Sequence, residues 1–224
     1  MKLKEVGIWA GVITVLIGGL WFLVSTVNNS PSPSNPIEMV NLPPVSKDDF
    51  AKGPESDKTG SESARVTLIE YGDFQCPACA AYFPLVKQIA EEFGNELRIV
   101  HRFFPLTNIH KNAMLAAQTA FAAGLQGKFW EMHDKLYANQ KSWAEEAKAK
   151  DIFIEYAGKL GLNTDQFIAD FNTESTKKFI TDQMNSGISI GINSTPSFFI
   201  NSKKIENPRD YEAFKQIIQD ALTK

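Results

Sequence analysis

The two cysteines of this chain lie in one short motif, Cys76-Pro77-Ala78-Cys79, and the sequence has no third cysteine. Two thiols at this spacing are one helical turn apart when a helix begins at the first, so they can form and break a disulfide without a change of fold. A disulfide that encloses so few residues adds little stability in the loop-entropy account. The spacing therefore favours thiol–disulfide exchange over a structural cross-link.

Two other chemistries of such a motif are disfavoured by the rest of the sequence. A structural zinc site needs about four ligands, and the chain has neither a second cysteine pair nor a ligand spacing among His101, His110 and His133. A c-type haem site needs a histidine directly after the second cysteine, where this sequence has Ala80. We therefore expect no metal and no cofactor other than the disulfide itself, and we expect all three histidines to be structural.

Cys76 is the expected nucleophile of the pair because it stands where a helix begins. The unpaired N–H groups and the dipole of a helix N-terminus favour a thiolate, and Pro77 suits the first turn because it has no N–H to leave unpaired. At such positions the pKa of a cysteine falls from about 8.5 to between roughly 3.5 and 7.5. Stabilising the reduced form raises the reduction potential, so Pro77 and Ala78 help to set the direction of exchange. Cys79, one turn deeper, is the expected resolving thiol.

Glu70 is the other residue that could take part in this chemistry. Strand alternation places Val66, Leu68 and Glu70 on one face, and two of these three are core residue types. A carboxyl on an inward face would have a raised pKa and could exchange a proton with Cys79 as a general acid or base. The alternative is that Glu70, at the end of its strand, simply reaches water.

The elements that position these residues alternate between strands and helices. Apolar, β-branched runs predict strands at Arg65–Tyr71 and Leu97–Phe104, joined by a helix at Cys76–Phe93 that ends at Gly94. A hairpin is expected at Ser197–Asn201 and Lys203–Ile205, followed by an amphipathic helix at Asp210–Leu222. Between them, the sequence predicts helices at His110–Gly124, Lys128–Tyr137, Asp151–Leu160, Thr164–Phe171 and Glu174–Ile190. The fold class is therefore an α/β sheet with an all-helical subdomain inserted at about 108–192.

Residues 6–27 form an uncharged and largely apolar run. As a helix this run would be about 33 Å long, close to the roughly 30 Å hydrocarbon core of a bilayer. Lys2 and Lys4 precede it, so the positive-inside rule leaves the short N-terminal tip in the cytoplasm and exports the rest. Residues 1–27 are then the cytoplasmic tip and the transmembrane segment. We expect an uncleaved, single-pass signal anchor, with a cleaved signal peptide as the alternative.

Residues 28–63 are rich in Pro and Ser, which is typical of a flexible linker, here spanning about 33 Å. The globular domain is then expected at 64–224. A net charge of -3 gives no reason to expect a nucleic-acid partner. We expect a monomer, because such a linker cannot build the core of a dimerisation domain.

Four segments, in the same order, resemble the DsbA-like thiol–disulfide oxidoreductases: Leu68–Cys79, His101–Leu106, Gly127–His133 and Ser194–Phe199. The resemblance covers about 64–222. It implies a thioredoxin-like sheet with an inserted helical domain, here preceded by one N-terminal transmembrane helix. It also implies that Cys76 is the nucleophile, that Cys79 resolves the mixed disulfide, and that Thr195-Pro196, with Pro196 in cis, faces them. The exposed backbone of Thr195 would then pair with an extended substrate chain.

The expected function is that of a membrane-anchored oxidoreductase whose catalytic domain is periplasmic or extracellular. It would oxidise unfolded or folding exported proteins through a mixed disulfide of Cys76 and be reoxidised by a membrane redox partner. Strong oxidants of the resembling family carry a histidine where this chain has Ala78, so we expect a milder oxidant. The alternatives are a reductase or isomerase of the same fold, or a tethered chaperone with a non-catalytic disulfide.

Overall fold

The computed structural model describes residues 63–223. The predicted transmembrane segment 6–27, and all of the predicted linker 28–63 except Ser63, lie outside the described residues. Among residues 63–223, no helix combines the length and the apolar character needed to cross a membrane.

The sheet has the strand order β2-β1-β3-β4. Its strands are β1 (Val66–Gly72), β2 (Leu97–Phe103), β3 (Ser197–Ile200) and β4 (Lys203–Lys204). β1 pairs in parallel with β2 and antiparallel with β3, which forms a hairpin with β4. A parallel pair needs a crossover connection, and α2 (Pro77–Phe93) supplies it between β1 and β2. The predicted strand–helix–strand unit and the hairpin are both confirmed.

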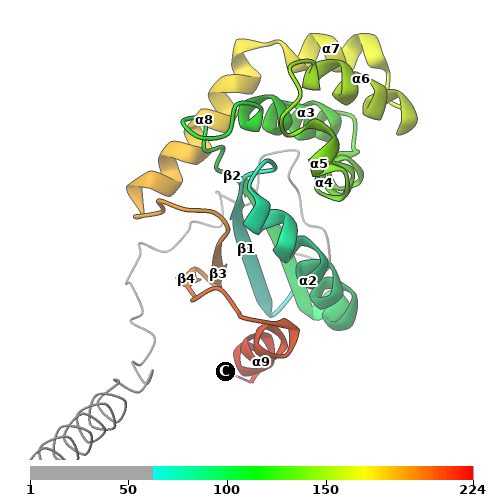
Figure 1. Ribbon diagram of the computed structural model, residues 1–224. Coiled ribbons are helices and arrows are strands. Elements are labelled where there is room, and N and C mark those ends of the chain that lie inside the picture. The colour runs from blue at the N-terminus through cyan, green and yellow to red at the C-terminus, as the bar shows by residue number, and fades with distance from the viewer. Residues whose placement is uncertain (1–62, 224) are drawn as a thin grey trace, which may run out of the picture. The chain divides into compact units, whose positions relative to one another are not determined.

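The helices between β2 and β3 form the predicted insert. Figure 1 shows most of it gathered at one end of the sheet, with α9 at the other end. The insert contains α3 (Ala113–Leu125), α4 (Phe129–Ala138), α5 (Gln140–Trp143), α6 (Ala149–Lys159), α7 (Thr164–Phe171) and α8 (Glu174–Ser189); α9 (Tyr211–Leu222) closes the chain. The core of the insert includes the buried Trp143, Phe153 and Phe167.

Helices cover both faces of the sheet. On one face, α2 and α9 pack on a core that contains Val66, Leu68, Ile89, Ile99, Phe198, Phe214 and Ile218. On the other face, α8 packs on β2, and Gly187 comes so close that a Cβ there would lie 2.9 Å from the ring of Phe104. β1 is therefore enclosed on both sides, which explains why Val66–Gly72 is buried along almost its whole length.

The predicted helix ends are confirmed at two caps, where the side chains of Asn163 and Thr173 accept hydrogen bonds from the backbone of their first turns. Two details of the insert differ from the prediction. α3 begins at Ala113 rather than His110, because the backbone N–H of Asn112 donates to Gln75 Oε1 and the preceding residues turn. A short helix, α5, was not predicted; it is fixed by tertiary contacts of Gln140 and the buried Trp143.

Candidate active site

The two cysteines lie at the start of α2, where the C-terminal ends of β1 and β2 meet the insert. Cys76 is the N-cap residue, Pro77 occupies the first helical turn, and Cys79 follows one turn into the helix. Both carry free thiols. Cys76 is 7% exposed and Cys79 is 0% exposed, whereas Pro77 and Ala78 face solvent. The predicted order of depth is therefore confirmed, and Cys76 is the thiol that an incoming sulfur can reach.

The surroundings of Cys76 stabilise a negative charge on its sulfur. Its pKa is lowered to about 5, mainly because the Cys79 thiol donates a hydrogen bond to the thiolate. Partial burial opposes this shift, while the side chain of Thr195 and the backbone N–H groups of Cys79 and Ala78 reinforce it. A thiol with such a pKa is ionised at neutral pH, which is the state that attacks disulfides and leaves them readily.

Cys79 and Glu70 are shifted in the opposite direction. Burial raises the pKa of Cys79 well above its ordinary value, and its hydrogen bond to Cys76 and the nearby Glu70 add to this. Burial also raises the pKa of Glu70 to about 8, with a smaller effect of the charge on Cys76. Glu70 is only 3% exposed, so it does not reach water as the alternative reading of the strand would have it. A carboxyl that titrates near neutrality beside a buried thiol can hold or supply that thiol's proton.

Thr195-Pro196 faces the cysteines from the start of β3, as the resemblance implies. The peptide bond between these two residues is cis. The Cys76 thiol donates to the carbonyl oxygen of Thr195 over 3.4 Å. Asn207 fixes the segment from behind, because its side-chain amide donates to the carbonyl of Pro196 over 3.0 Å.

A family model described as thioredoxin matches residues 54–220, about three quarters of the sequence. The chain belongs to the thioredoxin family. Solved structures agree with this at the level of the fold. BdbD from Bacillus subtilis is 22% identical, with a TM-score of 0.65 over 74% of this chain and 92% of that one. Alpha-DsbA1 from Wolbachia pipientis is 21% identical, with a TM-score of 0.66 over 75% and 91%.

A longer curated protein also matches: a Na(+)/H(+) antiporter NhaA 1 from Mycolicibacterium gilvum is 32% identical over 200 residues. The alignment covers 88% of this chain, but the chain spans only 30% of the length of that relative. The antiporter name thus belongs to a protein most of which has no counterpart here. Membership of the thioredoxin family, the DsbA-like fold and the thiol pair together support thiol–disulfide oxidoreductase chemistry for this chain.

The residues that shape the loop before Cys76 were not predicted from the sequence. The Asp73 carboxylate accepts from the backbone N–H of Gln75 and of Leu106, and its Oδ2 lies 2.6 Å from Nδ1 of His110. The backbone carbonyl of Asp73 accepts from the N–H of Cys76. The available signal was the polar pattern Asp73-Phe-Gln75 between a buried strand and a cysteine.

The insert also holds this loop directly. Gln140 of α5 donates to the backbone carbonyls of Phe74 and Cys76, over 2.8 and 3.0 Å. Gln75 donates to the carbonyl of Ala144 over 2.6 Å. No sequence pattern linked these glutamines to the cysteines, because the contacts join segments far apart in the chain. The helical insert therefore positions the nucleophile as well as covering it.

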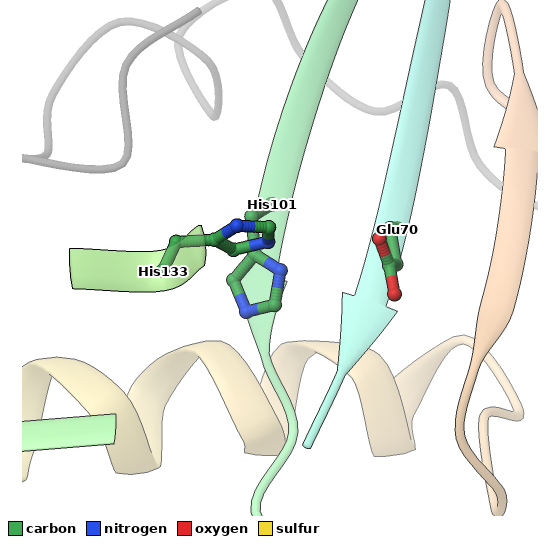
Figure 2. Close-up of side chains that lie close together, drawn as sticks. All are labelled: Glu70, His101 and His133. Atoms are coloured by element: carbon green, nitrogen blue, oxygen red, sulfur yellow. The ribbon is translucent and has the colours of Figure 1, made fainter. Parts of the chain in front are cut away.

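Three further buried residues lie close together although no sequence pattern linked them. Glu70 and His101 are register partners on β1 and β2, and Figure 2 shows the ring of His133 from α4 against that of His101. One possible ligand atom from each of these three buried residues lies within 4.8 Å of the others. His101 is not the satisfied structural histidine that was expected, since neither of its ring nitrogens has a hydrogen-bond partner within residues 63–223.

Proposed function

We propose that this protein is a membrane-anchored thiol–disulfide oxidoreductase that introduces disulfides into exported proteins through a mixed disulfide with Cys76. The observation that carries the proposal is the asymmetry of the pair: Cys76, the more exposed of the two, has a pKa near 5, and Cys79 is a fully buried thiol with a raised pKa. An exchange catalyst needs one thiol that attacks and leaves easily and a second that resolves the intermediate.

The proposed reaction starts from the Cys76–Cys79 disulfide. A substrate thiolate attacks the sulfur of Cys76, the S–S bond breaks, and Cys79 leaves and takes a proton from Glu70. A second substrate thiolate then attacks the substrate sulfur of the mixed disulfide and releases Cys76 as a stabilised thiolate. Two electrons pass from the substrate, which gains a disulfide, to the protein, which becomes a dithiol. A disulfide-bearing membrane partner takes these electrons and restores the starting state.

The direction of this reaction follows from the stability of the reduced form. Interactions that lower the pKa of Cys76 stabilise the dithiol relative to the disulfide and so raise the reduction potential. This favours an oxidase over a reductase or isomerase, although Ala78 supplies no positive side chain of its own to the motif.

Substrate binding is proposed at the exposed side of the motif. Thr195 lies half-buried beside the sulfur of Cys76, just before β3, so its peptide groups can pair with an extended chain. Such pairing depends on the substrate backbone and suits unfolded or folding proteins of varied sequence.

The proposed location is outside the cytoplasmic membrane, in the periplasm or extracellular space, with residues 6–27 as the anchor. The uncharged run and the preceding Lys2 and Lys4 support this placement. A tether of about 33 Å would keep a monomeric catalytic domain close to a membrane redox partner.

The decisive measurement is the equilibrium reduction potential of the full chain in glutathione buffers. A value of roughly -120 mV supports the oxidase, and one of roughly -270 mV points to a reductant. Cys76→Ser should abolish exchange and the mixed disulfide. A chain that never equilibrates with glutathione, or a Cys76→Ser variant that still forms disulfides in exported substrates, contradicts the proposal altogether.

A further inference from the structure

One group of three His, Cys, Asp or Glu side chains in residues 63–223 could hold a metal ion. It consists of Glu70, His101 and His133, hereafter the buried Glu–His–His cluster. The three come from β1, β2 and α4. In Figure 2 the two imidazole rings lie against each other, with the carboxyl of Glu70 on the adjacent strand. Each residue is less than 5% exposed, so the cluster lies in the protein core.

Polar atoms of this cluster lack the hydrogen bonds that buried groups ordinarily make. Glu70 Oε1 and both ring nitrogens of His101 have no partner within the described part of the chain, and the neighbouring Tyr137 hydroxyl has none either. These groups converge beside Gly72, where an added Cβ would lie 3.0 Å from the Tyr137 hydroxyl and 3.3 Å from Glu70 Oε1. Unsatisfied buried groups are costly, and several of them around one point indicate a ligand that supplies the missing contacts.

The types of donor in the cluster match one class of ligand. Two imidazoles and one carboxylate are the protein ligands of an open zinc site, which keeps a fourth position for water or another group. A neutral imidazole is the form that binds a metal.

His133 also has the support that metal-binding histidines usually have. Its Nδ1 lies 3.0 Å from Asp134 Oδ1, and a carboxylate on one ring nitrogen fixes the imidazole so that the other can bind a metal. Asp134 in turn lies 3.3 Å from the half-exposed Lys87. A cavity of about 10 Å³ is lined by Lys87, Asp134 and His133, so it borders one member of the cluster.

Zinc ligands at about 2.0–2.2 Å from the ion lie roughly 3.4 Å from one another. The three donor atoms here lie within 4.8 Å of one another. Binding therefore requires them to move together by about 1 Å, which small side-chain rotations can provide.

We propose that the buried Glu–His–His cluster binds one zinc ion, with Glu70, His101 and His133 as its protein ligands. No thiol belongs to this site, and its test does not depend on the proposed redox function. The two meet at Glu70, which can exchange a proton only while no metal is bound to it.

The test uses the full chain, stripped of metal and oxidised so that the two cysteines form a disulfide and cannot act as ligands. Equilibrium dialysis against zinc chloride should give one bound zinc per chain. X-ray absorption at the zinc edge should show two imidazole ligands and no sulfur. His133→Gln should weaken binding by about 100-fold or more, since losing a ligand costs at least as much as losing an outer-shell partner.

The matched control is His110→Gln, which changes the only other histidine in the sequence and should leave zinc binding unchanged. Circular dichroism checks that both variants are folded, and the absorption spectrum of the unmodified chain decides the ligands even if His133→Gln does not fold. The proposal is overturned if the oxidised chain binds no stoichiometric zinc, if the zinc has sulfur ligands, or if folded His133→Gln binds it as well as the control; the cluster would then hold only water. Zinc binding without thiol exchange, or exchange without zinc binding, separates this site from the proposed function.

Discussion

At the scale of single residues, Cys76 and Cys79 are one helical turn apart, and yet their pKa values move in opposite directions. The pKa of Cys76 is lowered to about 5 because Cys79 donates a hydrogen bond to it, and the pKa of Cys79 is raised because Cys79 is buried and makes that same bond. One interaction thus activates the first thiol and keeps the second protonated. Glu70, buried next to them, has a pKa near 8, which lies between those of the two thiols.

The reactivity of Cys76 should follow this pKa. In the reduced chain, alkylation of Cys76 by iodoacetamide should rise with pH around a midpoint near 5. Cys79→Ala removes the largest cause of the shift and should move the midpoint upward. Mass spectrometry of the alkylated peptide gives both curves. A midpoint near 8.5 in the unmodified chain would mean that Cys76 is not activated.

Glu70 should lower the stability of the metal-free protein at neutral pH. Its folded pKa, about 8, lies above its unfolded value of 4.5, so stability is lost as pH rises from 4.5 to 8. Glu70→Gln removes this loss and should stabilise the protein by up to about 3 kcal/mol at pH 7, with the gain vanishing below pH 4.5. The same variant should slow exchange, because Cys79 loses its proton partner.

Urea unfolding at several pH values measures the gain in stability. The exposed Glu96→Gln is the control, and it should change stability by less than about 0.5 kcal/mol. Equal pH profiles for unmodified protein and Glu70→Gln would show that Glu70 is not held at a raised pKa.

At the scale of elements, the insert and the sheet meet at the loop that precedes the cysteines. α5 holds the carbonyls of Phe74 and Cys76 through Gln140, and Asp73 fixes the turn from inside. On the face of the sheet opposite α2 and α9, α8 packs on β2, and Gly187 allows the close approach of Phe104. The inserted helices are therefore part of the machinery that positions the thiol.

Gln140→Ala should leave the buried backbone carbonyl of Phe74 without its donor, whereas the carbonyl of Cys76 keeps the N–H of Ala80. The expected loss of stability is about 1–3 kcal/mol, the cost of unsatisfied buried polar groups. Gln126→Ala is matched to it: this glutamine also donates to a backbone carbonyl, that of Asn163, but this hydrogen bond is exposed. Its loss should cost about 0.5 kcal/mol or less. Denaturant midpoints compare the two, and equal losses would argue against a role for Gln140 in holding the loop.

Two glycines of the insert should change stability in opposite directions when replaced by alanine. Gly187→Ala would place a Cβ 2.9 Å from the ring of Phe104 and should destabilise by about 1–3 kcal/mol through overpacking. Gly158→Ala meets only Thr164 Cγ2 at 3.9 Å and should stabilise α6 by up to about 1 kcal/mol. Thermal unfolding distinguishes the two. A Gly187→Ala variant as stable as the unmodified chain would mean that α8 does not pack closely on the sheet.

At the scale of the whole molecule, the redox state of the motif should control global stability. The thiolate of Cys76 exists only in the reduced chain, and its folded pKa is lowered below the ordinary value. A lowered acid pKa contributes stability that is present above the unfolded pKa and is lost as pH falls through the folded one. At pH 7 the reduced protein should therefore unfold at a higher temperature than the oxidised protein, and the difference should shrink towards pH 5. An oxidised form that is more stable at pH 7 would contradict the proposed role as an oxidant.

The sequence determined the elements and their order, because the apolar periodicities of β1, β2 and α9 and the caps at Asn163 and Thr173 are local signals. It also predicted which cysteine lies deeper and that Glu70 lies on an inward face, since both follow from helix and strand periods. The start of α3 and the existence of α5 could not be predicted, because contacts with Gln75 and Phe74 decide them.

The thiol pair could be predicted from the sequence, because its two cysteines lie within a single helical turn. The tertiary structure alone decided what surrounds that pair. Pairing of β1 with β2 places Glu70 beside His101, and the packing of α4 brings His133 to both. Burial then shifts the pKa values of Glu70 and Cys79, because desolvation depends on every element that excludes water from a site and not on any one segment.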